Sequence, residues 1–274
     1  EFEQIKEKSK TNKGILQVSG CMESQKSHLM YGLSGIAPYR LILAEDERRA
    51  REIYEDYRFY DRKVYSYPAK DLLFFQADIH GNLLIRQRMK VIKALLEEKE
   101  LTVVTSIDGC MDFLESLEKI KEQLIHYESD STVDIEQLKN QLVALGYERV
   151  GQVEMPGQFS VRGGIVDIYC LTEENPWRIE LWGDEHIGDK DMVSFLDYFP
   201  EERTIIFLDE PNRLTEKGGA VEEEYRQSRM HREEKGSRNL PENWLCSFEQ
   251  LQKELNKRNC ISVCALEPKQ AGWK

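Results

Sequence analysis

The sequence contains no long apolar run, no apolar leader and no cysteine framework. No stretch approaches the roughly eighteen apolar residues of a membrane helix, and the first residues lack the pattern of a signal peptide. The six cysteines have neither disulfide-scaffold nor zinc spacing, so we expect reduced, mostly buried thiols. The five histidines have no Cys, Asp or second His at ligand spacing. We therefore expect a cytoplasmic protein without a membrane partner or a bound metal.

The charge balance is acidic. The chain has 50 Asp and Glu against 38 Lys and Arg, a net charge of −12. Because DNA binding needs clustered cations, this balance predicts no strong DNA binding by the chain itself. Arginines and glutamates interleave between residues 222 and 238, which is typical of a solvated helix. The sequence starts at Glu1 rather than at Met, and we expect it to be a piece of a longer protein.

Strand-like and helical segments alternate at both ends of the chain. Apolar, β-rich runs predict strands at 14–18, 40–44, 63–67, 101–105 and 204–208. Helical patterns between and after them cover 26–32, 46–57, 83–98 and 221–235. This alternation predicts an α/β domain whose strands pair in parallel and whose sheet is covered on both faces.

The middle of the chain has a different pattern. A capping box at 131–134 predicts the start of a helix, and Gly146 can supply its left-handed end. Segments 150–155, 158–169 and 177–182, with a turn at 156–157, then predict antiparallel strands without intervening helices. We interpret residues 111–185 as a small α+β, β-rich module inserted into an α/β domain formed by residues 1–110 and 186–274.

The segment after the first strand has nearly the layout of a phosphate-binding loop. Gly20, Lys26 and Ser27 have the required spacing, but Gln25 stands where a working loop has glycine. A side chain there obstructs the approach of the backbone to a phosphate, and Glu23 adds a repelling carboxylate. We interpret this loop as a structural relic of a nucleotide site.

The apolar strand at 204–208 ends in Asp209 and Glu210, where nucleotide-hydrolysing domains hold magnesium. A strand followed by a solvated acidic turn is the alternative, which Pro211 and Asn212 would favour. Together with the loop, this strand predicts a degenerate P-loop, RecA-like domain. No residues in the chain form a nucleophile system, so we predict no catalytic residues.

Several segments resemble one bacterial family. They lie at 67–74, 146–150, 156–169, 178–185 and 207–213. These segments closely resemble the N-terminal, UvrB-like module of transcription-repair coupling factors (Mfd). The nearest rival is UvrB, the excision-repair helicase, which is expected to keep an intact loop and an acidic residue at 164. Gln25 and Gly164 both favour the coupling factors. After Glu185 the chain departs from the coupling-factor pattern, because a segment usual in that family is missing and the residues from His186 resemble a later region.

The resemblance implies a function in nucleotide excision repair. It implies that the inserted module recruits UvrA, with Arg149, Phe159 and Arg162 as the partner-binding residues. Strand alternation places Phe159 and Val161 on one face and Arg162 on the other. The alternative is therefore that Phe159 lies in the core and that Arg162 pairs with a nearby acidic residue.

The resemblance also implies a non-catalytic arm of an ATP-dependent DNA translocase. Other domains of such a protein would bind ATP, magnesium, DNA and RNA polymerase, and the chain itself would need no cofactor. An active UvrB-type nucleotide-dependent helicase domain is the alternative.

Overall fold

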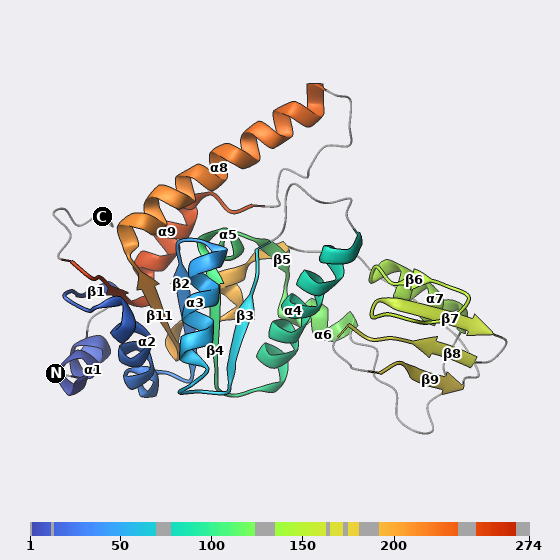
Figure 1. Cartoon of the computed structure of the whole chain (residues 1–274), viewed down its shortest axis with the longest axis horizontal. Helices are drawn as coiled ribbons and strands as arrows, with labels where there is room; N and C mark the ends of the chain where they lie inside the picture. The colour runs from blue at the N-terminus through green and yellow to red at the C-terminus, as the bar shows by residue number, and fades with distance from the viewer. Residues whose placement is uncertain are drawn as a thin grey trace. The chain divides into compact units, whose positions relative to one another are not determined.

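A computed structural model shows an α/β protein of two compact units (Figure 1). It describes residues 2–11, 14–69, 78–123, 135–162, 165–171, 175–180, 192–234 and 245–266. The first unit comprises residues 1–73, 91–117 and 192–274, and the second comprises residues 74–90 and 118–191. The predicted bounds of the inserted module, 111–185, stay a prediction. In the described helices, none is long and apolar enough to span a membrane.

A six-stranded sheet forms the centre of the first unit, and all its strands pair in parallel. Its order is β1 (Gly14–Val18), β12 (Asn259–Val263), β11 (Thr204–Asp209), β2 (Tyr39–Ala44), β4 (Leu101–Ser106) and β3 (Val64–Tyr67). Every residue of β2, β4 and β11 is buried, because helices cover both faces of the sheet. The predicted parallel α/β sheet is therefore confirmed.

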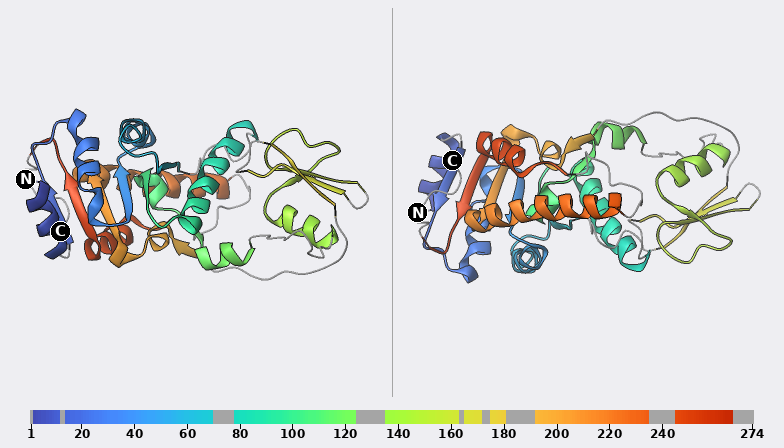
Figure 2. Two further views of the ribbon diagram at one scale, coloured as in Figure 1. Left: turned by 90° about the horizontal axis from the view of Figure 1, so that it is seen from below. Right: turned by 90° about the horizontal axis from the view of Figure 1, so that it is seen from above.

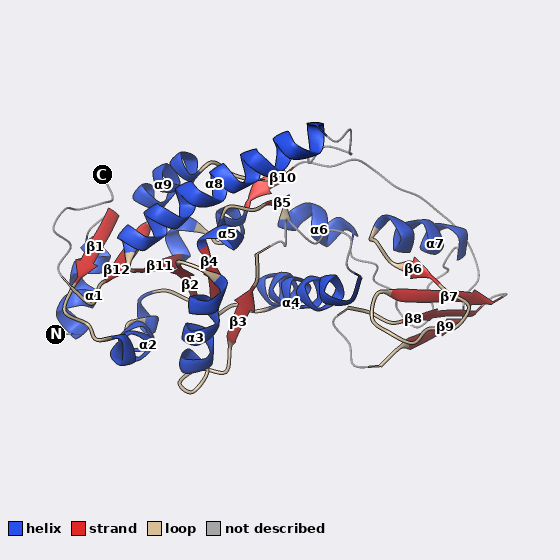
Figure 3. Ribbon diagram, turned by 45° about the horizontal axis from the view of Figure 1, so that its top comes forward, coloured by secondary structure: helices blue, strands red, loops and turns tan. Residues whose placement is uncertain are grey.

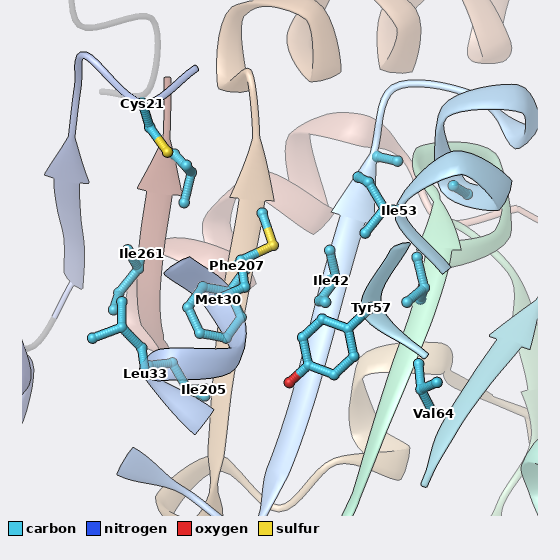
Figure 4. Packing of buried hydrophobic residues seen from close by; sticks show 14 residues of the cluster. Cys21, Met30, Leu33, Ile42, Ile53, Tyr57, Val64, Ile205, Phe207 and Ile261 are labelled. Atoms are coloured by element: carbon cyan, nitrogen blue, oxygen red, sulfur yellow. The ribbon is translucent and has the colours of Figure 1, made fainter. Parts of the chain in front are cut away.

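Helices α2 (Glu23–Gly32) and α3 (Glu47–Tyr57) cover one face, while α8 (Pro211–Glu234) and α9 (Phe248–Lys257) lie on the other (Figures 2 and 3). The Asp46 side chain caps α3 by accepting from the Arg49 backbone N–H at 2.7 Å. Figure 4 shows this packing: Met30 of α2, Leu33 just after α2, and Ile53 and Tyr57 of α3 lie on the helix side, and Ile42, Phe207 and Ile261 lie on the sheet.

Several elements of this unit differ from the sequence-based prediction, among them α8 and β12. The helix predicted at 221–235 begins ten residues earlier, at Pro211, because proline suits the first turn of a helix, where its missing N–H is not needed. The alternative of a solvated acidic turn after the strand at 204–208 is wrong, because Asp209 is buried and α8 begins directly after Glu210. Strand β12 was not predicted, although it lies inside the sheet between β1 and β11.

Shorter elements complete the first unit and connect it to the second. Strands β5 (Phe113–Glu115) and β10 (Met192–Ser194) form an antiparallel pair. The remaining helical segments are α1 (Phe2–Thr11), η1 (Ser34–Ile36), α4 (Asp78–Glu97), α5 (Ile107–Cys110), α6 (Leu117–Gln123), η2 (Phe195–Tyr198) and η3 (Glu201–Arg203).

The second unit packs helix α7 (Ile135–Ala144) on a four-stranded sheet. The strand order is β6 (Glu148–Arg149), β7 (Gln158–Arg162), β8 (Ile165–Ile168) and β9 (Trp177–Glu180). Leu138 and Leu142 of α7 are buried against the sheet, and Gly146 has the predicted left-handed conformation, with φ of 84°. The predicted capping box at 131–134 lies outside the described residues.

The strand predicted at 150–155 is wrong. Residues 150–155 form a loop, in which the backbone N–H groups of Glu154 and Met155 donate to the Gln158 side chain instead of to a neighbouring strand. The preceding strand β6 is two residues long and pairs with β7 in parallel, whereas β7, β8 and β9 are antiparallel as predicted. The Gln158 side chain therefore accepts the hydrogen bonds for which the prediction expected a neighbouring strand.

Candidate functional site

The carboxyl ends of β1 and β11 carry the residues that were predicted as a relic nucleotide site. Gly20 follows β1 with φ of 81°, and α2 begins three residues later. Gln25 is exposed in the first turn of this helix, while Lys26 and Ser27 point into the protein and are buried. Asp209 ends β11, so the parallel sheet brings the two predicted motifs to one edge.

Lys26 is enclosed by carboxylates. Its Nζ donates to Asp209 Oδ1 at 2.8 Å and to Glu210 Oε1 at 2.6 Å, and Glu23 Oε1 lies 2.7 Å away. The Lys26 side chain is 0% exposed and that of Asp209 is 3% exposed. Three acceptors thus use the three N–H donors of the ammonium group.

Arg49 of α3 joins the same cluster and was not predicted. Its Nε donates to Asp209 Oδ2 at 2.7 Å, and its Nη2 donates to Glu23 Oε2 at 2.5 Å. Both oxygens of Asp209 are therefore bonded, one to each cation. Glu210 Oε1 also accepts from the backbone N–H of Ala265 at 2.7 Å. The backbone of Glu210 has a φ of 50°, which is unusual for a residue other than glycine.

The electrostatics of this cluster favour the charged forms of Lys26 and Arg49. Burial alone would lower the pKa of Lys26, but its hydrogen bonds to Asp209, Glu210 and Glu23 outweigh burial and raise that pKa. Burial likewise opposes the charge of Arg49, and the bonds to Asp209 again raise the pKa. A phosphate could reach Lys26 only by displacing bonded carboxylates. Among the described residues, no group of three His, Cys, Asp or Glu could hold a metal.

The predicted partner-binding residues lie in the second unit, and Phe159 is part of its core. The ring is 0% exposed and packs with Leu138, Leu142, Val166 and Ile168. Because no part of its side chain reaches the surface, Phe159 can support a docking surface only by holding the sheet and α7 together.

Arg162 lies on the face of the sheet that α7 does not cover. Its side chain is 57% exposed, and its Nη2 donates to Asp167 Oδ2 at 2.8 Å. The side chain of Asp167 is only 12% exposed. A hollow of about 470 Å³ surrounds this pair and is lined by Gln152, Val153, Arg162, Asp167, Pro176 and Trp177.

Arg149 lies on the edge strand β6 and is exposed. The register pairs it with Phe159, so strand alternation places it on the opposite side of the sheet from Arg162. Within the described part of the chain it has no ion-pair partner. The structure therefore does not bring the two arginines together, and a partner that contacts both must reach around the β6 edge.

Two residues of these sites, Arg49 and Asp167, were not predicted from the sequence. Nothing in the spacing of the charged helix singles out Arg49, because its partners in the cluster, Glu23 and Asp209, are 26 and 160 positions away. Asp167 could have been predicted, because β7 and β8 lie within the segment 158–169 that was predicted as β-structure. Alternation along these two paired strands places Ser160, Arg162 and Asp167 on one face.

The second unit has one helix packed on a small sheet, with arginines on its edge strand and on the face that α7 does not cover. Residues 125–188 match the family model of the UvrB interaction domain. This match spans α7 and all four strands of the second unit.

Three proteins to which the chain is similar are transcription-repair-coupling factors. The protein of Bacillus subtilis (strain 168) is 33% identical over 183 residues, which cover 61% of this chain and 16% of the relative. That of Staphylococcus aureus (strain bovine RF122 / ET3-1) is 29% identical over 164 residues, 54% of this chain and 14% of the relative. That of Staphylococcus haemolyticus (strain JCSC1435) is 32% identical over 123 residues, 45% of this chain and 10% of the relative.

These matches confirm the resemblance to the N-terminal, UvrB-like module of a transcription-repair coupling factor. The matched region spans about a sixth or less of the length of these relatives.

Proposed function

We propose that the second unit docks UvrA and that the chain is the non-catalytic recruitment arm of a transcription-repair coupling factor. In the whole protein, other domains would use ATP and magnesium to translocate on DNA and would contact RNA polymerase. The match of residues 125–188 to the UvrB interaction domain supports this proposal, as does the similarity to the coupling factors.

The observation that carries the docking proposal is the exposure of two arginines on one small sheet. Arg149 is exposed without an ion-pair partner in the described residues, and the side chain of Arg162 is 57% exposed. Arginine is enriched among the residues that dominate interface energies, because its planar fork binds carboxylates. An acidic surface of UvrA is the partner that this sheet would fit.

Replacing either arginine by alanine should weaken UvrA binding without unfolding the protein. We expect Arg149→Ala and Arg162→Ala each to cost about 2 kcal/mol or more of binding free energy, which is roughly 30-fold in affinity. Calorimetric or optical titration of the chain with purified UvrA measures this effect.

Arg226→Ala is the matched control. Arg226 is an exposed arginine of α8 in the first unit, and its Nη2 lies 2.7 Å from Glu223 Oε2. Its removal should leave both UvrA affinity and melting temperature unchanged. If both arginines of the second unit can be removed without loss of affinity, the assignment of the docking surface is wrong.

The first unit is, in our proposal, a degenerate P-loop domain that no longer binds nucleotide. The internal bonds of Lys26 support this, because they occupy the ammonium group that a phosphate would need. Calorimetric titration with Mg-ATP should therefore show no binding at micromolar nucleotide. Gln25→Gly should not restore binding, since Asp209 and Glu210 would still hold Lys26. Saturable binding by the unchanged chain would favour an active UvrB-type helicase domain instead.

A further inference from the structure

The carboxylate of Glu23 bridges two cations that come from neighbouring helices of the first unit. Glu23 begins α2, and its Oε1 lies 2.7 Å from Nζ of Lys26 on the same helix. Its Oε2 accepts from Nη2 of Arg49 on α3 at 2.5 Å. The side chains of Lys26 and Arg49 are 0% and 13% exposed, whereas that of Glu23 is 55% exposed. An anion at the surface therefore joins α2 to α3 through two largely buried cations.

The three carboxylates around Lys26 are not equally anchored. Asp209 is almost buried and bonds both cations, and Glu210 also accepts from the backbone N–H of Ala265. Within the part of the chain that the structure describes, the carboxylate of Glu23 has hydrogen-bond and ion-pair contacts to Lys26 and Arg49 alone. Glu23 is therefore the carboxylate whose position an anion from solvent could take.

A bridging carboxylate and a free oxyanion bind cations in the same way. Each offers two oxygens to two charged N–H donors, and such charge-assisted bonds are strong for carboxylates and phosphates alike. Lys26 and Arg49 face the three carboxylates of Glu23, Asp209 and Glu210, a net charge of −1. Without the Glu23 carboxylate the cluster would be neutral, so one bound monoanion would restore its present charge.

We propose that Glu23 is a built-in replacement for an external oxyanion, and that its carboxylate holds α2 to α3 by filling the position between Lys26 and Arg49. The first unit then keeps this arrangement without any bound phosphate. The inference rests on the proposed degenerate P-loop. It adds the residue that closes the site and the class of anion, phosphate or sulfate, that the position takes once the carboxylate is removed.

Glu23→Ala in inorganic phosphate tests this position. Alanine suits a helix, so the variant should fold, but it should melt at a lower temperature than the unchanged chain because the bridge is lost. Sodium phosphate at about 50 mM should raise its melting temperature by about 3 °C or more, compared with sodium chloride of equal ionic strength. Phosphate also stabilises proteins through its exclusion from their surface, so the shift measured for the unchanged chain is subtracted.

Two further variants separate occupancy of the position from a general effect of charge. Glu52→Ala also removes a carboxylate beside Arg49, but the partners of Glu52 in the described residues, Arg48 and Arg49, both lie on α3. This control should show no excess shift in phosphate. Glu23→Gln removes the same charge as Glu23→Ala, but its amide still fills the position, so it should gain less from phosphate than the alanine variant.

An excess shift that is largest in Glu23→Ala supports the inference. If Glu23→Ala gains no more than the unchanged chain, or if Glu52→Ala or Glu23→Gln gains as much, phosphate does not take the position of the carboxylate and the inference is overturned. These results would leave the proposed loss of nucleotide binding intact, because that proposal fails only if the unchanged chain binds Mg-ATP.

Discussion

Lys26→Met should lower the free energy of unfolding of the first unit by about 3–5 kcal/mol, because it removes one partner of a buried ion pair and leaves carboxylates behind. Asp209 would lose the bond to one oxygen, and Glu210 would keep its left-handed backbone with one fewer contact. Methionine fills a similar volume, so the loss reports the charge rather than a cavity. Urea unfolding followed by circular dichroism measures the change.

Lys253→Met provides the control for this effect. Lys253 also pairs with a glutamate, Glu249 at 2.5 Å, but its side chain is 65% exposed. Exposed pairs of this kind contribute about 0.5 kcal/mol or less. If both lysines could be replaced at the same small cost, the cluster around Lys26 would not stabilise the carboxyl edge of the sheet.

Phe159→Ala should lower the free energy of unfolding of the second unit by about 3–5 kcal/mol, the range for a large aromatic residue in a packed core. The expected cavity lies between β7 and α7, among Leu138, Leu142 and Val166. The apparent UvrA affinity of this variant should fall only in proportion to the fraction of molecules whose second unit is folded. Thermal unfolding and titration at a temperature where the variant is folded separate the two effects.

Val143→Ala is the control for Phe159, because it shortens an exposed apolar side chain of the same unit and should change stability by about 0.5 kcal/mol or less. A Phe159→Ala protein that melts like the unchanged chain but fails to bind UvrA would contradict the core assignment and place the ring in the interface.

Much of the α/β sheet was predictable from local patterns. Strands such as β2 and β11 are buried on both faces, so each contains a short apolar run, 41–44 in β2 and 205–208 in β11, that stands out in the sequence. Strand β12 was missed, although a signal preceded it: Ser247 and Gln250 form a capping box that starts α9. A helix recognised there would have implied a following strand.

The candidate sites were predictable only in part, because their contacts join distant segments. Motif spacing and parallel pairing together place Lys26 near Asp209, and the structure joins them. The pattern could not show that Arg49 completes the cluster, since this depends on how α3 packs beside α2. In the second unit, alternation correctly separated the core position of Phe159 from the exposed position of Arg162.

The position of β12 has a consequence for synthesis of the chain on the ribosome. Among the strands that the structure describes, β1 pairs with β12 alone, so residues 14–18 have no strand partner among them until residues 259–263 have been made. At roughly 5–20 residues per second, this leaves an apolar strand unpaired for a time on the order of ten seconds or more. A chain arrested before residue 259 would expose β1 and one edge of β11, both of them templates for aggregation.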